Sequence, residues 1–230
     1  MIDCSLMKKR NLTPRALRIG GLFLAAVLGL AAARAEDPKP LYTNNFSQVE
    51  TGKAPEDFLI LDGGWIVKEE GGGKVLELPG APLDTYGALF GPTTKSDIAV
   101  TARVLSTKKG RRFPTFGLGL NGQSGYRLQV APGKGELELY HGDDLLAHVP
   151  FEWKSGDWTL LRLQITHSGA VWKVAGKAWS KGTPEPEQPL ITSSEDKEPA
   201  PGRSAIWGSP YATTPIQFTD LVVTKLPAQP

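Results

Sequence analysis

The sequence predicts an all-β protein folded as a two-sheet antiparallel sandwich of the jelly-roll kind. Apolar and polar residues alternate with a period of two in one segment after another, and turns rich in glycine separate these segments. Beyond residue 35, no stretch of ten residues or more carries a helical apolar stripe. About a dozen short strands in one open sheet would twist until the sheet split into two packed layers. Residues 36–230 suffice for one such core, so we expect a single domain over that range.

The clearest alternation lies in the middle of the chain. Apolar residues occupy every second position of segment 98–105, and segments 116–120, 126–130 and 136–140 repeat the pattern. Further strands are predicted at 41–46, 65–69, 74–78, 87–90, 145–149, 158–166, 170–174, 204–207 and 216–226. Segment 182–202 differs because it combines five prolines with five acidic residues. Proline cannot donate a backbone hydrogen bond to a neighbouring strand, and acidic side chains resist burial. We expect a long surface loop there.

The first 35 residues have the three parts of an export signal. Lys8, Lys9 and Arg10 belong to a basic start, residues 19–30 are apolar apart from glycines, and Ala33 and Ala35 form a small-x-small cleavage pattern. The apolar run is shorter than the ~20 residues that a spanning helix needs, and an acidic, proline-bearing segment follows it. We therefore expect a signal peptide over 1–35, a periplasmic or secreted protein and no permanent membrane span. A retained membrane anchor is the alternative.

Charge and cysteine content exclude several classes of function. Residues 1–35 contain six of the 26 basic residues but one of the 24 acidic ones, which leaves 20 basic and 23 acidic side chains and a formal net charge of −3 over 36–230. An acidic remainder argues against nucleic acid as a partner. Cys4 is the only cysteine and lies within the predicted signal, so the rest of the chain can form neither a disulfide nor a cysteine-ligated metal site.

Motifs near both ends and in the middle of the chain carry a resemblance to a known family. They are Asn45-Phe46, Gly64-Trp65, Gly125-Tyr126-Arg127-Leu128, Gly156-Asp157-Trp158, the segment 177–186 and the closing Phe218-Thr219-Asp220-Leu221-Val222-Val223. Together they resemble concanavalin A-like lectin and glucanase jelly rolls, with the end of the chain most similar to laminin-G-like and 3-keto-disaccharide hydrolase-like domains of exported bacterial proteins. The resemblance covers nearly all of residues 36–230 and implies a concanavalin A-like fold.

The resemblance suggests carbohydrate as the ligand, because such folds serve lectins, glycan-binding modules, glycosidases and lyases. Two function classes remain open. The first is an exported, non-catalytic binding or interaction domain that recognises a glycan or polysaccharide. The alternative is a glycoside hydrolase or lyase of the 3-keto-disaccharide hydrolase type. A structural role beside an unknown protein partner in a larger exported assembly is a third possibility.

Strand alternation also predicts a ligand-binding face. If the apolar side chains of the central strands point inward, the intervening ones share the outer surface, where Gly117 and Gly119 would leave a trough without side chains. Guanidinium groups and an aromatic ring beside a trough suit a hydroxyl-rich ligand. The side chains expected on this face are Arg103, Arg127, Gln129 and Tyr140. Trp207 and Tyr211 lie in a segment with glycine and proline, and we expect them to be an exposed, ligand-binding pair. A solvated or loop-covered sheet is the alternative.

No strong catalytic constellation is present. Glu136 and Glu138 lie two residues apart on a predicted strand, with α-carbons ~6.5 Å apart on one face, near the separation of paired carboxylates in a glycosidase. The alternative is that these acids solvate an exposed face, and we expect no catalytic residue. The acidic Glu-x-Asp-x-x-Glu pattern of laminarinase-like relatives is absent.

No cofactor is expected apart from calcium. The resemblance implies a calcium site between the chain ends, where Asp220 would be a ligand, although Asn45 stands where many relatives carry an acid. The basic segment 108–112 is predicted to be a charged hairpin tip between two strands.

Overall fold

The computed structural model describes residues 40–81, 84–211 and 214–227, so the predicted signal peptide lies outside the described residues. Within these ranges the chain forms fifteen strands. None of the described residues forms a helix long and apolar enough to cross a membrane. The predicted all-β class is confirmed.

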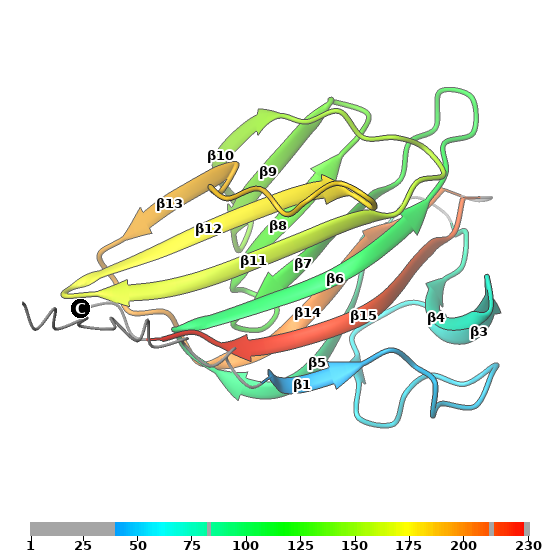
Figure 1. Ribbon diagram of the computed structural model, residues 1–230, viewed down its shortest axis with the longest axis horizontal. Coiled ribbons are helices and arrows are strands. Elements are labelled where there is room, and N and C mark those ends of the chain that lie inside the picture. The colour runs from blue at the N-terminus through cyan, green and yellow to red at the C-terminus, as the bar shows by residue number, and fades with distance from the viewer. Residues whose placement is uncertain (1–39, 82–83, 212–213, 228–230) are drawn as a thin grey trace, which may run out of the picture. The chain divides into compact units, whose positions relative to one another are not determined.

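The strands form two antiparallel sheets that face each other as layers (Figure 1). The eight-stranded sheet A has the order β13-β12-β11-β6-β15-β4-β3, and β1 pairs with β15. Its strands are β1 (Pro40–Asn44), β3 (Ile66–Glu70), β4 (Gly73–Leu78), β6 (Ile98–Ser106), β11 (Thr159–Ser168), β12 (Val171–Ser180), β13 (Ile191–Glu195) and β15 (Ile216–Lys225).

The seven-stranded sheet B has the order β10-β9-β8-β7-β14-β5-β2. Its strands are β2 (Leu59–Ile60), β5 (Tyr86–Thr94), β7 (Thr115–Leu120), β8 (Tyr126–Ala131), β9 (Glu136–His141), β10 (Asp144–Pro150) and β14 (Gly202–Ser209). The predicted two-sheet antiparallel jelly roll is therefore confirmed.

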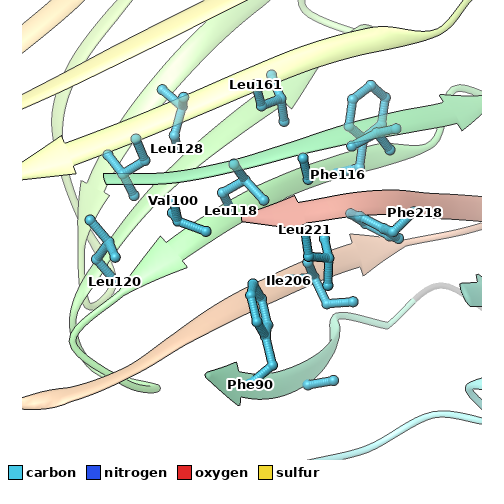
Figure 2. Close-up of a cluster of buried hydrophobic side chains, with 14 of the residues drawn as sticks. Phe90, Val100, Phe116, Leu118, Leu120, Leu128, Leu161, Ile206, Phe218 and Leu221 are labelled. Atoms are coloured by element: carbon cyan, nitrogen blue, oxygen red, sulfur yellow. The ribbon is translucent and has the colours of Figure 1, made fainter. Parts of the chain in front are cut away.

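The core lies between the two sheets, as the alternation predicts. Val100 of β6 and Leu161 of β11, from sheet A, lie in one cluster with Leu118 and Leu128 of sheet B, and all four are fully buried (Figure 2). Residues one position away, such as Gln129, remain partly exposed. The strand register proposed from the sequence is thus correct in the central strands.

The predicted long loop at 182–202 is wrong in part, because residues 191–195 form the edge strand β13 of sheet A. Ile191 anchors this strand opposite Gly176, and a β-carbon on Gly176 would collide with Leu128 and Ile191. One apolar residue among polar neighbours carries no alternation signal, which is why the strand was missed. The two-residue strand β2 lies in the continuous apolar run 58–61, which does not alternate either, and β12 runs six residues beyond its predicted end at Val174.

The basic segment 108–112 forms a tight exposed turn, in which Lys109 and Arg112 exchange backbone hydrogen bonds of 3.0 and 3.1 Å. The strands on either side of it belong to different sheets, since β6 lies in sheet A and β7 in sheet B. The predicted hairpin between paired strands is therefore wrong, and this turn instead belongs to the connection that carries the chain from one layer to the other.

Candidate functional site

The residues predicted to share one ligand face lie on opposite sides of the sandwich. Arg127 and Gln129 on β8 and Tyr140 on β9 face outward from sheet B, whereas Arg103 on β6 faces outward from sheet A. The strand β6 lies in the other layer from β8 and β9 (Figure 1). The single-face prediction is therefore wrong for Arg103. Alternation determines which side chains point away from the core, but two facing sheets have two outer surfaces, and only tertiary pairing assigns a strand to one of them.

The glycines of sheet B do not leave an open trough. A β-carbon on Gly119 would lie 2.7 Å from Nε1 of Trp207, and one on Gly87 would collide with the six-membered ring of the same indole. Trp207 is only 8% exposed and packs with Leu89, Ala205 and Leu61 in a small apolar cluster outside the main core. The predictions of an empty trough and of an exposed Trp207 are both wrong, because the absent side chains make room for the indole.

Arg127 lies between two aromatic rings on this surface. Its Cζ atom is 4.8 Å from the ring centroid of Tyr140, the cross-strand neighbour on β9, and 6.0 Å from that of Trp207. Both contacts are in the range of cation–π attraction. The Nε atom of Arg127 is buried and has no hydrogen-bond partner among the described residues. The guanidinium is therefore positioned mainly by packing.

Glu138 is the centre of a buried polar network beside Arg127. Its carboxylate is fully buried and accepts hydrogen bonds from Lys134 Nζ at 2.6 Å, Gln129 Nε2 at 2.8 Å and the Tyr140 hydroxyl at 3.1 Å. Burial raises the pKa of the Glu138 carboxyl, but these three donors outweigh burial and hold the pKa below its usual value. The network thus fixes the conformations of Gln129, Lys134 and Tyr140 around an ionised carboxylate.

A pocket of about 290 Å³ opens on sheet B beside this network. Gln129 and Lys134 form one side of it, and the partly exposed Tyr211 and Phe113 supply aromatic surface. Arg111, from the basic turn, also lines the pocket. Below, these residues are called the sheet B pocket. Of the residues predicted to bind ligand, Gln129 and Tyr211 line it, while Tyr140 holds the buried carboxylate next to Gln129. Lys134, Phe113 and Arg111 were missed because turns connect them to sheet B and no periodic pattern marks them.

Glu136 and Glu138 do project from one face, as predicted. Glu136 Oε1 lies 3.1 Å from Nδ1 of His148, whereas Glu138 accepts hydrogen bonds from three donors. A glycosidase needs one carboxyl with a raised pKa to protonate the leaving group. The lowered pKa of Glu138 is opposite to that requirement. Both of its oxygens also accept hydrogen bonds.

Asp220 and Arg103 meet on the outer surface of sheet A. Arg103 Nη2 lies 2.7 Å from Asp220 Oδ2, and Asn45 lines the same cavity as both residues. Among the described residues, no group of three His, Cys, Asp or Glu side chains is placed to hold a metal ion. Asp220 therefore has a cation of the protein as its nearest charged partner, and calcium at this residue stays a prediction.

These features define the class of fold as a concanavalin A-like jelly-roll sandwich. No protein-family model matches the chain, and no curated protein matches it. Several solved structures are similar to this chain in fold. The exoplasmic or lumenal domain of VIP36 in its Ca²⁺-bound form has a TM-score of 0.58 at 10% identity over 85% of this chain and 95% of its own.

Two further solved structures have the same fold. Carbohydrate-binding module CBM66 from Bacillus subtilis has a TM-score of 0.53 at 11% identity, covering 73% of this chain and 95% of its own. Lectin II from Ulex europaeus has a TM-score of 0.52 at 12% identity, covering 81% and 99%. At these identities the similarity establishes the fold alone.

Proposed function

We propose that the protein is an exported, non-catalytic carbohydrate-binding domain that takes a glycan or polysaccharide at the sheet B pocket. The observation that carries the proposal is the buried carboxylate of Glu138, which holds three polar side chains in place on the outside of a sheet. A purely solvated sheet face has no need of such a network. The likeness in fold to lectins and to a carbohydrate-binding module supports the same class of function.

The pocket has the chemical groups that a sugar requires. Gln129 can accept through its amide oxygen while its nitrogen bonds Glu138, and Arg111 presents guanidinium donors. Tyr211 and Phe113 offer ring surface to the apolar face of a pyranose. Because Glu138 already fixes Gln129 and Lys134, binding loses less side-chain entropy than it would at a mobile surface.

Binding without turnover is supported by the state of Glu138. Its lowered pKa and its three hydrogen-bond donors favour the ionised form, which is opposite to what the proton donor of a glycosidase requires. Export to the periplasm or the exterior is supported by the signal pattern in residues 1–35, and the acidic charge of residues 36–230 disfavours nucleic acid as a ligand.

A glycan array followed by calorimetry tests the proposal. We expect the purified protein to bind at least one glycan. Tyr211→Ala removes a stacking surface and Arg111→Ala removes a charged donor, so each variant should bind that glycan about tenfold more weakly or worse. Neither side chain bonds Glu138, so both variants should fold normally. Thr192→Ala, which changes an exposed residue of the edge strand β13 that does not line this pocket, is the matched control and should bind as the parent does.

Two outcomes would contradict the proposal. Equal affinity in the parent and in both pocket variants would remove the sheet B pocket. Release of product from 3-keto-glycosides by the parent, abolished by Glu138→Gln, would establish the hydrolase or lyase alternative instead.

A further inference from the structure

Two cavities on the outer surface of sheet A meet at Arg103 and Asp220. The first, of about 470 Å³, is also lined by Trp158, Asn45 and Lys181, and the second, of about 310 Å³, by Trp179. Arg103 and Asp220 line both cavities, so the two adjoin at this ion pair, and together they are called the sheet A groove below. This sheet A groove shares no lining residue with the sheet B pocket.

A β-bulge turns Asp220 toward this groove. In regular alternation Asp220 would point the same way as Phe218, which is fully buried in the core. The pairing of β15 with β6 shifts register between Thr219 and Val222, and Asp220 takes a left-handed φ of +51°. The extra residue restores Leu221 to the core and leaves the carboxylate outside. An acid is thus placed on the groove floor by a local distortion of the last strand.

Arg103 is held from two sides but remains accessible. Its Nη2 atom donates to Asp220 at 2.7 Å, and its Cζ atom lies 5.4 Å from the ring centroid of Trp158. The Nε atom is buried without a partner among the described residues. Of the two side chains, Arg103 is 30% exposed and Asp220 45% exposed. A ligand in the groove can therefore reach a charged donor and a charged acceptor that lie side by side.

Two partly exposed indoles lie on the β11–β12 side of the pair. Trp158 precedes β11 and Trp179 lies near the end of β12, and their positions in the alternation direct both outward from sheet A. Leu160, the cross-strand neighbour of both Arg103 and Trp179, adds apolar surface between them. Outward tryptophans beside a polar pair are an arrangement suited to the CH-rich face of a sugar ring.

The charges of the groove are close to balance. Arg103 is neutralised by Asp220, and Glu185 lies 2.8 Å from Lys177 and 3.8 Å from Arg162. Lys74, Lys181 and Glu70 also line the first cavity, so four basic and three acidic side chains line the two cavities together. A groove whose charges nearly balance offers little attraction to an anion. A neutral ligand whose adjacent hydroxyl groups both donate and accept fits it better.

We propose that the sheet A groove is a second saccharide-binding site, in which Asp220 accepts from and Arg103 donates to two neighbouring hydroxyl groups of a neutral sugar. Trp158 and Trp179 form the stacking surface on the β11–β12 side of this pair. The site stands on its own residues and does not depend on the sheet B pocket. It would give the domain two ligand faces on opposite sides of the sandwich.

A nuclear magnetic resonance titration tests this site. The probes are neutral gluco-, xylo-, manno- and galacto-oligosaccharides, and the readout is the indole Nε1–H resonances of Trp158 and Trp179. We expect at least one probe to shift both resonances, and Asp220→Asn to weaken the binding that these shifts report by about tenfold to a hundredfold, as the loss of a charged hydrogen bond implies. Asparagine tolerates a left-handed φ, so this variant keeps the bulge.

The controls separate this site from the sheet B pocket. Glu198→Gln removes a carboxylate from another exposed ion pair, with Lys95 at 2.9 Å, and should leave the shifts unchanged. Tyr211→Ala should also leave them unchanged, whatever it does to total glycan affinity. The inference is overturned if no neutral oligosaccharide shifts the two indoles, if Asp220→Asn binds as the parent does, or if only calcium chloride or inorganic phosphate shifts them.

Discussion

Nε1 of Trp207 lies 2.7 Å from the position that a β-carbon on Gly119 would occupy, so the glycine and the indole share one space on the outer surface of sheet B. The indole is thereby held between β14 and β7, where it covers Ala205 and contacts the guanidinium of Arg127. Gly119, which suggested an empty trough, therefore makes room for the Trp207 indole.

Gly119→Ala should displace Trp207 and destabilise the protein by about 1–3 kcal/mol, because the added methyl group overpacks a filled site. The free energy of unfolding from denaturant titration measures the effect. Gly133→Ala is the matched control, since its β-carbon would meet Phe113 at an ordinary 3.8 Å, and it should change stability by less than about 0.5 kcal/mol. Equal effects of the two substitutions would argue against this packing.

Leu128→Ala should cost about 2–5 kcal/mol, because it leaves a cavity at a fully buried position where sheet A and sheet B meet. Thr101→Ala, at a partly exposed position of β6, should cost less than about 0.5 kcal/mol. The midpoints of denaturant unfolding measure which substitution costs more, provided that the dependence of the unfolding free energy on denaturant is the same in both variants. A larger loss for Thr101→Ala would show that the strand faces are assigned the wrong way round.

Glu138→Gln should lower stability by about 1–3 kcal/mol at neutral pH, since three donors lose a charged acceptor. The folded-state pKa of Glu138 lies below its usual value. Ionised Glu138 therefore stabilises the fold in full above its unfolded-state pKa of ~4.3. This stabilisation is lost as the pH falls through the lower folded-state pKa. The stability difference between parent and variant should therefore shrink in acid. A difference that stays constant from neutral to acidic pH would contradict this network.

Tyr126→Phe should leave stability unchanged or raise it by up to about 1 kcal/mol. The Tyr126 hydroxyl is buried with no hydrogen-bond partner among the described residues, and burial raises the pKa of this phenol to about 12. Phenylalanine keeps the stacking on His141, whose ring centroid is 4.4 Å away. Tyr140→Phe is the contrast, because it breaks the bond to Glu138 and should cost about 0.5–1.5 kcal/mol in thermal or chemical unfolding.

Cleavage of the export signal should leave Glu36 as the first residue of the exported protein, because Ala33 and Ala35 occupy the small positions that signal peptidase requires. Intact-mass spectrometry of protein recovered from outside the cytoplasm measures the new terminus. Detection of a peptide that spans residues 34–36 in the exported protein would show that this junction is not cut.

The sequence by itself determined the class of fold and the inward or outward direction of most side chains. Both follow from local periodicity: a period of two marks a strand, and Val100, Leu118, Leu128 and Leu139 are all buried as their alternation requires. The same alternation applies to Trp158 and Trp179. Their chain neighbours Thr159 and Ala178 are buried, so the outward direction of both indoles follows from the strand period.

Only the tertiary structure decided which outward residues meet. β6 and β7 follow each other in the chain but lie in different sheets, which separates Arg103 from Arg127. The pairing of β15 with β6, with a bulge that alternation cannot reveal, instead brings Arg103 to Asp220 from more than a hundred residues away. Strand pairing is a long-range choice made by the packing of the whole core, whereas periodicity reports only the face on which each side chain lies.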